Sequence, residues 1–176
     1  MINTFDNIPA VSDKETQGKR IYNDIEVIRE ADVDYENLPT IDETARTIEP
    51  FTLKEGAEWK KLSLVKYTPS ATSEGSAGDI TSTVTNTVTG TLGGDRVVID
   101  NLLENHVGEA FFLRVTDRFT QKKVVYGRPY SPMFLSAFSK RKTADNTSCD
   151  VTFSNESFFQ PLEQIARAVE KEEATE

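Results

Sequence analysis

The sequence predicts a mainly β protein: an antiparallel β-sandwich or barrel with one flanking helix, an extended N-terminal arm and a C-terminal amphipathic helix. Two observations carry this prediction. From Trp59 onwards, apolar and polar residues alternate with a period of two, which is the pattern of half-buried strands. Turn residues interrupt this alternation at intervals of about 8–12 residues, and such spacing is typical of sandwiches and barrels.

The clearest strand pattern spans residues 79–92, where every odd position from 81 to 91 is threonine. A strand of this kind has two unlike faces. It carries no charge between Ile80 and Gly94, so as a free edge it would pair with other chains. We therefore expect it to be paired inside the fold or by a neighbouring subunit, with its hydroxyls in a channel or in an intersubunit sheet. The residues of this candidate assembly or lumen surface are Thr81, Thr83, Thr85, Thr87, Thr89 and Thr91.

The other elements of the predicted β domain, residues 57–160, follow one another closely. A first strand is predicted at 59–67, a loop of small residues at 70–78 and a helix over 97–107. Their short connections require the remaining strands to be antiparallel neighbours. These strands are predicted at 110–117, 122–126, 133–140 and 147–154.

Residues 1–56 are predicted to be an acidic extended arm, because acidic residues and prolines separate their short apolar clusters. With one short helix near residues 21–30, this arm buries too little apolar surface to fold alone, and we expect it to order only against a partner. Deleting residues 1–50 should then leave a folded β domain. Residues 161–176 are predicted to be a C-terminal helix and acidic tail, in which one helical face carries Leu162, Ile165, Ala166 and Val169.

Charge is concentrated at the two ends of the chain of 176 residues. Residues 1–56 hold 13 acidic and 6 basic residues, residues 57–160 hold 11 and 12, and residues 161–176 hold 5 and 2. A protein that binds duplex DNA would need a broad basic face, so this distribution argues against one. No apolar run approaches the roughly 18 residues of a membrane span, and the N-terminus shows no secretory signal. A single cysteine cannot form a disulfide within the chain, and together with the lack of a secretory signal it predicts a protein made in a reducing cytoplasm.

Few residues point to chemistry, and no cofactor or metal is predicted. His106 is the only histidine, so neither a His-based metal cluster nor a histidine pair is expected. Cys149 lies on the expected buried face of its strand, where a thiol behaves as a small hydrophobic group. A possible phosphate contact is offered by three consecutive bases, although such a run at a hairpin tip is more often a solvated turn: Lys140, Arg141 and Lys142.

Aromatic residues could form a stacking platform for single-stranded nucleic acid, as in oligonucleotide-binding barrels. They fall on both faces of two adjacent predicted strands, and this arrangement favours packing in the core instead. The residues concerned are Phe111, Phe112, Phe119, Tyr126 and Tyr130.

Three runs within residues 59–160, FLRVTD, KKVVYGRPYSPMFLSAF and DNTSCDVTFSNES, resemble small structural proteins of Bacteroidota phages, of the tail-tube, tail-terminator and neck-ring group. The resemblance implies a β-sandwich with one flanking helix that forms homo-oligomeric rings of six or twelve subunits, whose long strands close a barrel around the DNA channel. It implies a place in the virion, assembled in the host cytoplasm, and DNA that passes without specific binding. Residues 1–56 are not part of the pattern.

We therefore expect a non-enzymatic bacteriophage virion structural protein that forms a ring in the tail or neck. Its N-terminal arm and C-terminal helix would contact other virion proteins. The alternative is a binding module that holds carbohydrate or single-stranded nucleic acid on its sheet. An enzyme ranks third, and several convergent polar residues in a deep pocket would favour it.

Overall fold

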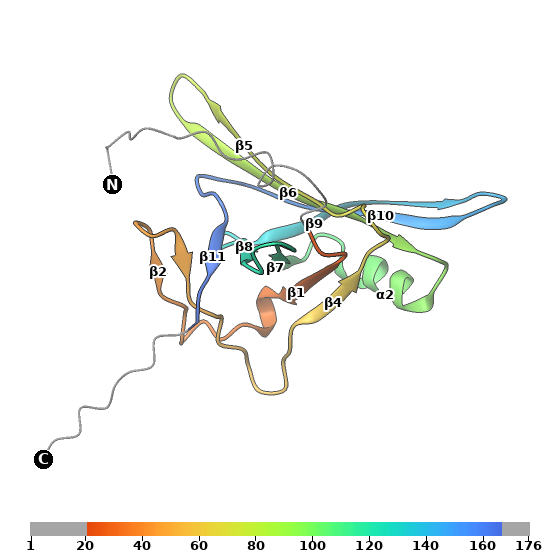
Figure 1. The fold of residues 1–176 in the computed structure, drawn as a ribbon, viewed down its shortest axis with the longest axis horizontal. Coiled ribbons are helices and arrows are strands. Elements are labelled where there is room, and N and C mark those ends of the chain that lie inside the picture. The colour runs from red at the N-terminus through yellow and green to blue at the C-terminus, as the bar shows by residue number, and fades with distance from the viewer. Residues whose placement is uncertain (1–20, 167–176) are drawn as a thin grey trace, which may run out of the picture.

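One sheet of eleven strands runs through residues 21–166, the part of the chain that this computed structural model describes (Figure 1). The prediction of a mainly β protein with one flanking helix is confirmed, and that helix, α2, spans Val97–His106. The sheet is not closed into a barrel. The remaining elements are β1 (Asp24–Arg29), the short 3-10 helix η1 (Glu30–Asp32), β2 (Ile41–Asp42), β3 (Thr47–Ile48), β4 (Lys60–Ser63), β5 (Ser70–Ala77), β6 (Ser82–Gly93), β7 (Ala110–Thr116), β8 (Lys123–Tyr126), β9 (Met133–Lys142), β10 (Thr147–Ser157) and β11 (Leu162–Gln164).

Strand β7 divides the sheet into two regions. On one side it pairs with β1. On the other side its first residues pair with β9 and the following residues pair with β8, so that β9 and β8 follow each other along the same edge. Beyond β9 lie β10, β6 and β5, and we call these four strands the hairpin region. Strands β4, β1, β7, β8, β11, β3 and β2 form the base region. In Figure 1 the hairpin region extends across the top of the molecule, above the base region and α2.

The two faces of β7 belong to two separate hydrophobic cores. Phe112 lies in one core, whereas Phe111 and Leu113 lie in the other, as the alternation of side chains along a strand requires. The larger core combines residues of both regions and of α2, among them Val27, Val88, Leu92, Ile99, Leu103, Val151 and Phe153. The smaller core lies on the other face of the base region and consists of Ile28, Val33, Ile48, Phe51, Phe112, Val125 and Leu162.

The described part of the predicted N-terminal arm is not an arm. Strand β1 takes the place of the expected short helix and lies between β4 and β7, inside the base region. Its Ile25 and Val27 are buried in the larger core. β-Branched residues favour a strand once a pairing partner is available, and β7 supplies that partner from far along the chain. Residues 1–20 lie outside the described residues.

A partly buried ion pair joins β1 to β7. The guanidinium group of Arg114 donates two hydrogen bonds to the Glu26 carboxylate, at 2.6 and 2.8 Å, and stacks on the ring of Trp59 at 4.4 Å. Burial raises the pKa of Glu26, but the hydrogen bond and charge of Arg114 outweigh it, so the pKa of Glu26 is lowered. Glu26 is therefore ionised at neutral pH and holds β1 in register.

Two further expectations are corrected. Residues 70–78 are not a loop, because Ser70–Ala77 pair with β6 as strand β5. Small residues have weak strand preference, and the paired neighbour decides their conformation. The predicted C-terminal helix does not begin at residue 161, since Leu162–Gln164 form β11 between β8 and β3 and Leu162 is buried in the smaller core. The end of that predicted helix and the acidic tail, residues 167–176, lie outside the described residues.

Two truncations test the place of β1. Deleting residues 1–20 removes no described strand, so the variant should unfold cooperatively in urea like the full chain. Deleting residues 1–50 removes β1 and uncovers one edge of β7 together with both cores, so that variant should show no cooperative unfolding transition by circular dichroism. A variant lacking residues 1–50 that kept the stability of the full chain would show that β1 is dispensable.

Candidate functional site

The predicted threonine strand is β6, which begins at Ser82 and leaves Thr81 in the preceding turn. Its even positions face the larger core: Asn86 and Val88 are buried, whereas the threonines within β6 are half-buried on the opposite face. Gly90 also belongs to the core face, because a Cβ at this position would lie 2.3 Å from Cδ1 of Leu64. The strand thus has the two unlike faces that its sequence predicts.

Neighbouring strands extend the row of hydroxyls into a surface that is four strands wide. Thr89 lies between Ser70 of β5 and Thr152 of β10 in the register, and Thr87 lies between Thr72 and Ser154. On β9, the Ser136 hydroxyl accepts a hydrogen bond of 2.8 Å from Ser154. We call this surface of the hairpin region the hydroxyl face: Ser70, Thr72, Ser76, Thr83, Thr85, Thr87, Thr89, Thr91, Ser136, Ser139, Ser148, Thr152 and Ser154.

The hydroxyl face has little charge, and what it has is mostly negative. Glu74 and Glu156 are the register neighbours of Thr85 on either side. Arg141 is the one cation on the described strands of this face, and its guanidinium lies 3.3 Å from the carboxylate of Asp150. Phosphate groups would therefore find no unpaired cation on this surface.

Beneath the hydroxyl face, a buried pair of asparagines fixes the hairpin region to its surroundings. The Asn86 amide donates to the side-chain oxygen of Asn155 at 3.0 Å and to the carbonyl of Phe159 at 3.0 Å. The Asn155 amide donates in turn to the carbonyls of Ser131 and Pro132 at 3.2 and 3.1 Å. The signal in the sequence is Asn86 itself, a polar residue at a core position of the alternation, but its partners cannot be identified without the fold.

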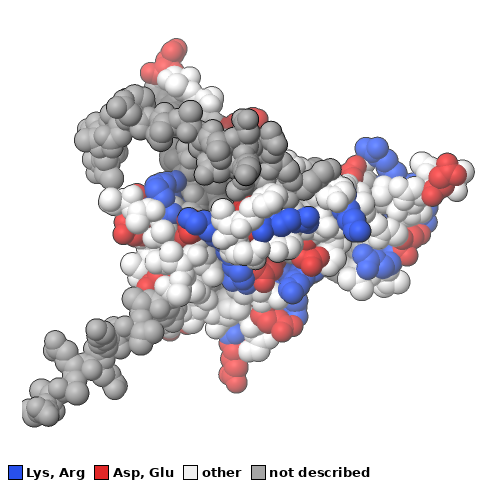
Figure 2. Space-filling view, in the orientation of Figure 1, with Lys and Arg blue, Asp and Glu red and all other residues white. Residues whose placement is uncertain are grey.

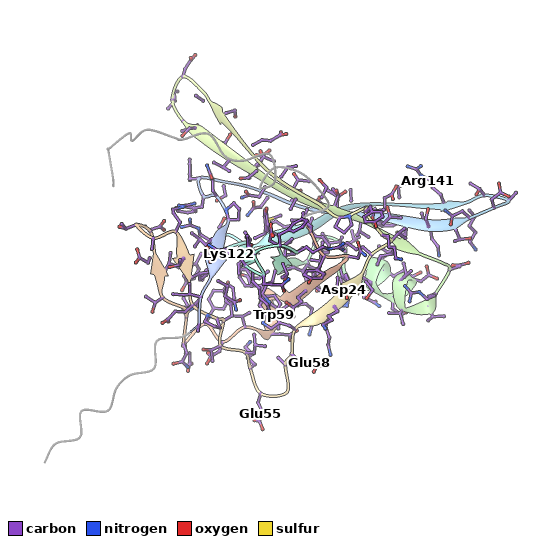
Figure 3. The ribbon with its side chains drawn as sticks, in the orientation of Figure 1. Asp24, Glu55, Glu58, Trp59, Lys122 and Arg141 are labelled. Atoms are coloured by element: carbon purple, nitrogen blue, oxygen red, sulfur yellow. The ribbon has the colours of Figure 1, made fainter. Side chains whose placement is uncertain are left out.

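The three consecutive bases at the tip of the β9–β10 hairpin point to opposite faces. Lys140 contacts the carboxylates of Asp95 and Asp100 at 2.8 and 2.5 Å, and Lys142 contacts Asp95 at 2.5 Å. Arg141 lies on the side of the hairpin away from α2 (Figure 3). All three cations already have carboxylate partners within the chain, so they form no ready phosphate site. The face shown in Figure 2 likewise mixes basic and acidic side chains and has no broad basic field.

The remaining candidate residues do not assemble a reactive site. His106 lies at the end of α2 with its Nδ1 2.8 Å from the Glu109 carboxylate. Cys149 is fully buried, and burial raises the pKa of its thiol. Within residues 21–166, no group of three or more His, Cys, Asp or Glu side chains is placed to hold a metal ion. In the same range, no helix combines the length and apolar character needed to cross a membrane.

The aromatic residues do not form one exposed platform. Phe111, Phe112 and Tyr126 are buried in the two cores. Phe119 and Tyr130 are exposed but lie in different loops, and Tyr130 packs edge-on against Tyr35 at a ring distance of 5.3 Å. Core packing is the main role of this group.

A groove of about 990 Å³ lies between α2 and β4, and sequence reasoning did not find it. All four residues of β4 line it, as does the loop that precedes β4, whose Glu55 and Glu58 are labelled in Figure 3. Val98 and Leu102 of α2 line the opposite wall. The two walls come from parts of the chain that only the fold brings together.

Comparisons with models of known protein families and with curated protein sequences find no match for this chain. Its function is therefore inferred from the surfaces described above.

Protonation of Asp95 tests the ion pairs that neutralise the basic run. Hydrogen bonds from Lys140 and Lys142 hold the pKa of Asp95 at about 2. Because this pKa is lowered in the folded state, the contribution of the carboxylate to stability is present above the ordinary value of about 3.9 and is lost as the pH falls towards 2. Replacing both lysines by methionine should return the pKa of Asp95 towards about 3.9 in a carboxyl NMR titration.

The matched control is Lys122→Met, which removes a lysine paired with Glu163 elsewhere on the surface and should leave the pKa of Asp95 unchanged. An Asp95 carboxyl that titrated at its ordinary value in the unmodified protein would contradict the pairing.

Proposed function

We propose that this chain is a non-enzymatic structural protein of a bacteriophage virion that forms a ring in the tail or neck, with its hydroxyl face towards the DNA channel. The observation that carries the proposal is a four-stranded layer, the hairpin region, with one open edge on each side. Such edges pair with further strands wherever copies of the chain meet.

The two open edges belong to β5 and to the outer part of β9. Strand β5 pairs with β6 alone. From Ser136 to Lys142, β9 pairs with β10 on one side, and no described strand lies on its other side. β5 also carries few of the features that protect natural edges, since Glu74 is its only charge and it contains no proline.

Strand directions allow these edges to join copies into a closed ring. Each strand in the order β9, β10, β6, β5 is antiparallel to the one before it. In copies related by rotation about one axis, β5 of one copy therefore meets β9 of the next in antiparallel orientation. This contact uses different surfaces on the two partners, and contacts of this kind generate rings when the rotation closes.

The expected ring size fits a channel. Six copies of a four-stranded layer, with strands about 4.8 Å apart and tilted about 40° to the axis, give a barrel of about 24 Å backbone radius. Side chains would occupy only the outer part of this interior, so a channel would remain open along the axis, as in other large barrels.

The chemistry of the hydroxyl face suits a surface that DNA passes without binding. Affinity for DNA comes mainly from cations that neutralise phosphates. On this face Arg141 is paired with Asp150, and Glu74 and Glu156 add negative charge. Threonine supplies hydrated hydroxyls while keeping the strand preference of a β-branched residue.

The alternative function, a module that holds carbohydrate or single-stranded nucleic acid on its sheet, has less support. Such sites depend on exposed aromatic rings for stacking. The hydroxyl face carries no Trp or Tyr on its described strands, and Phe134 is its only aromatic residue.

Edge pairing is tested by imaging and sedimentation of the full chain, which should form closed rings. Successive residues of a strand direct their N–H groups to opposite sides. Of the two variants Ala71→Pro and Thr72→Pro, one therefore removes only a donor that faces away from β6. That variant should keep the stability of the parent monomer and lose the rings. Rings that persist in the folded variant, or a full chain that stays monomeric at all concentrations, would contradict the proposal.

The orientation of the hydroxyl face is tested with lysine. Thr83 and Thr87 are half-buried on the hydroxyl face, so Thr83→Lys with Thr87→Lys should leave the monomer folded. If this face lines the channel, rings still form, and DNA is retained by them in a salt-dependent manner. Thr83→Ser with Thr87→Ser is the matched control and should retain no DNA. If the face is instead buried between subunits, the two lysines would prevent assembly. Unchanged behaviour of the lysine variant in every assay would show that the face is an ordinary surface.

A further inference from the structure

The backbone hydrogen bonds of β6 fix the hand of the hairpin region. The Thr91 N–H donates to the Thr68 hydroxyl at 3.2 Å, and the Thr91 carbonyl accepts from the Val65 N–H at 2.8 Å; both partners precede β5. The threonine positions of β6 therefore direct their backbone groups towards β5. In a strand of L-residues that runs upward, a residue whose side chain faces the observer directs these groups to the observer's right. Seen from the hydroxyl face with β6 running upward, β5 thus lies to the right of β6, and β10 and β9 lie to its left.

Closure into a barrel has a hand of its own. Because sheets twist, the strands of a barrel rise to the right when they are seen from outside. A line across the strands of one copy therefore meets the next copy with a stagger along the strand. A tilt of about 36° corresponds to about one residue per strand, which is about four residues per copy. An odd stagger would exchange the two faces, and two or six residues would need tilts of about 20° or about 47°, outside the usual range of about 35–45°.

The sign of this stagger depends on which face is inside. One line of register partners crosses the four strands: Ser70, Thr89, Thr152 and Ala137. If the hydroxyl face is inside, this line continues from Ala137 into Glu74 of the next copy, and β5 lies opposite the free part of β9. If that face is outside, Ser70 lies opposite Met133, which already pairs with β7. Of the two orientations, the inward one alone brings the two open edges together.

We propose that neighbouring copies join β5 to β9 in this single register, with Glu74 of one copy opposite Ala137 of the next, and that the register turns the hydroxyl face inward. This inference rests on the ring proposed above and names its contact residue by residue. Two residues further along the same edge, Thr72 lies opposite Ser139.

An exposed aromatic ring on the core face of β9 fits this contact. Phe138 is the register partner of the buried Val151, yet it is 47% exposed in the single chain. In the proposed register Phe138 lies opposite Ser73 of the next copy, and its diagonal neighbours there are Ala71 and Gly75. These short side chains leave room for the ring, so the contact covers apolar surface that the single chain exposes.

Disulfide cross-linking of the full chain tests the register. Oxidation of the variant with Glu74→Cys and Ala137→Cys should give a ladder of covalent oligomers, because opposite residues of paired strands lie within disulfide reach. Thr72→Cys with Ser139→Cys should do the same. Within one chain, β5 and β9 are three strand spacings apart, about 14 Å, so the two cysteines cannot join. Cys149 is fully buried and does not compete.

The matched controls combine Ala137→Cys with a cysteine elsewhere along the edge that leads into β5. Lys66→Cys would lie opposite it only if the hydroxyl face were outside, and Ser70→Cys only if there were no stagger, so neither pair should cross-link. Efficient cross-linking of either control pair would overturn the register. Rings without the cross-link between positions 74 and 137 would refute this contact and leave the proposed function standing. That cross-link in open assemblies that never close into rings would do the reverse.

Burial of Phe138 gives a second readout. Phe138→Ser should weaken assembly in sedimentation by about tenfold, because the contact then loses the burial of an aromatic ring. Phe134→Ser is the matched control and should leave assembly within about twofold, since Phe134 is 43% exposed on the same strand but lies where β7 already pairs with β9. Equal effects of the two variants would show that the contact does not cover Phe138 and would overturn this register.

Discussion

Strand β7 pairs with three other strands, although a strand has only two edges. Strand β1 takes one edge, and β8 and β9 share the other in succession. Because β8 and β9 continue into different neighbours, the sheet has to divide at this point. The base region then surrounds the smaller core, and the larger core fills the space shared by both regions and α2. The open edges of the hairpin region and the groove beside β4 follow from this division.

Electrostatics in this molecule serve mainly to fix positions. Arg114 binds Glu26 across β7 and β1, Lys140 binds two carboxylates near the start of α2, and Arg128 pairs with Glu43 of the β2–β3 connection. Residues 57–160 are nearly neutral in the sequence, and the structure shows where much of that charge is cancelled. A surface whose cations are held by its own carboxylates has few left for phosphates.

Local patterns explain which parts of the fold could be predicted. The helix predicted over residues 97–107 is α2, and Gly108 follows it with a positive φ of 83°; the residues that it buries are Ile99 and Leu103, whereas Val98 is exposed. The two faces of β6 followed from strict alternation. In contrast, β1, β5 and β11 are strands because of partners distant in the chain; Glu26 and Arg114, for example, are 88 residues apart. The threonines of the candidate site were predictable from the sequence. Ser70, Thr152 and Ser154 could not be assigned to the same face without the register of the strands. The groove could not be predicted either, because it exists only where α2 approaches β4.

The pairing of β6 with β10 also determines when β6 can be covered during synthesis of the chain. The β5–β6 hairpin is local and can form early, but its inner partner is complete only after the 64 residues from Gly94 to Ser157 have been made. At a rate of chain synthesis of about 5–20 residues per second, the core face of the nascent hairpin stays uncovered for roughly 3–13 s. A second apolar face would make it a site of aggregation on the ribosome. Threonine on the outer face keeps the strand preference and limits the exposed apolar surface to one side, so the same hydroxyls protect the unfinished chain.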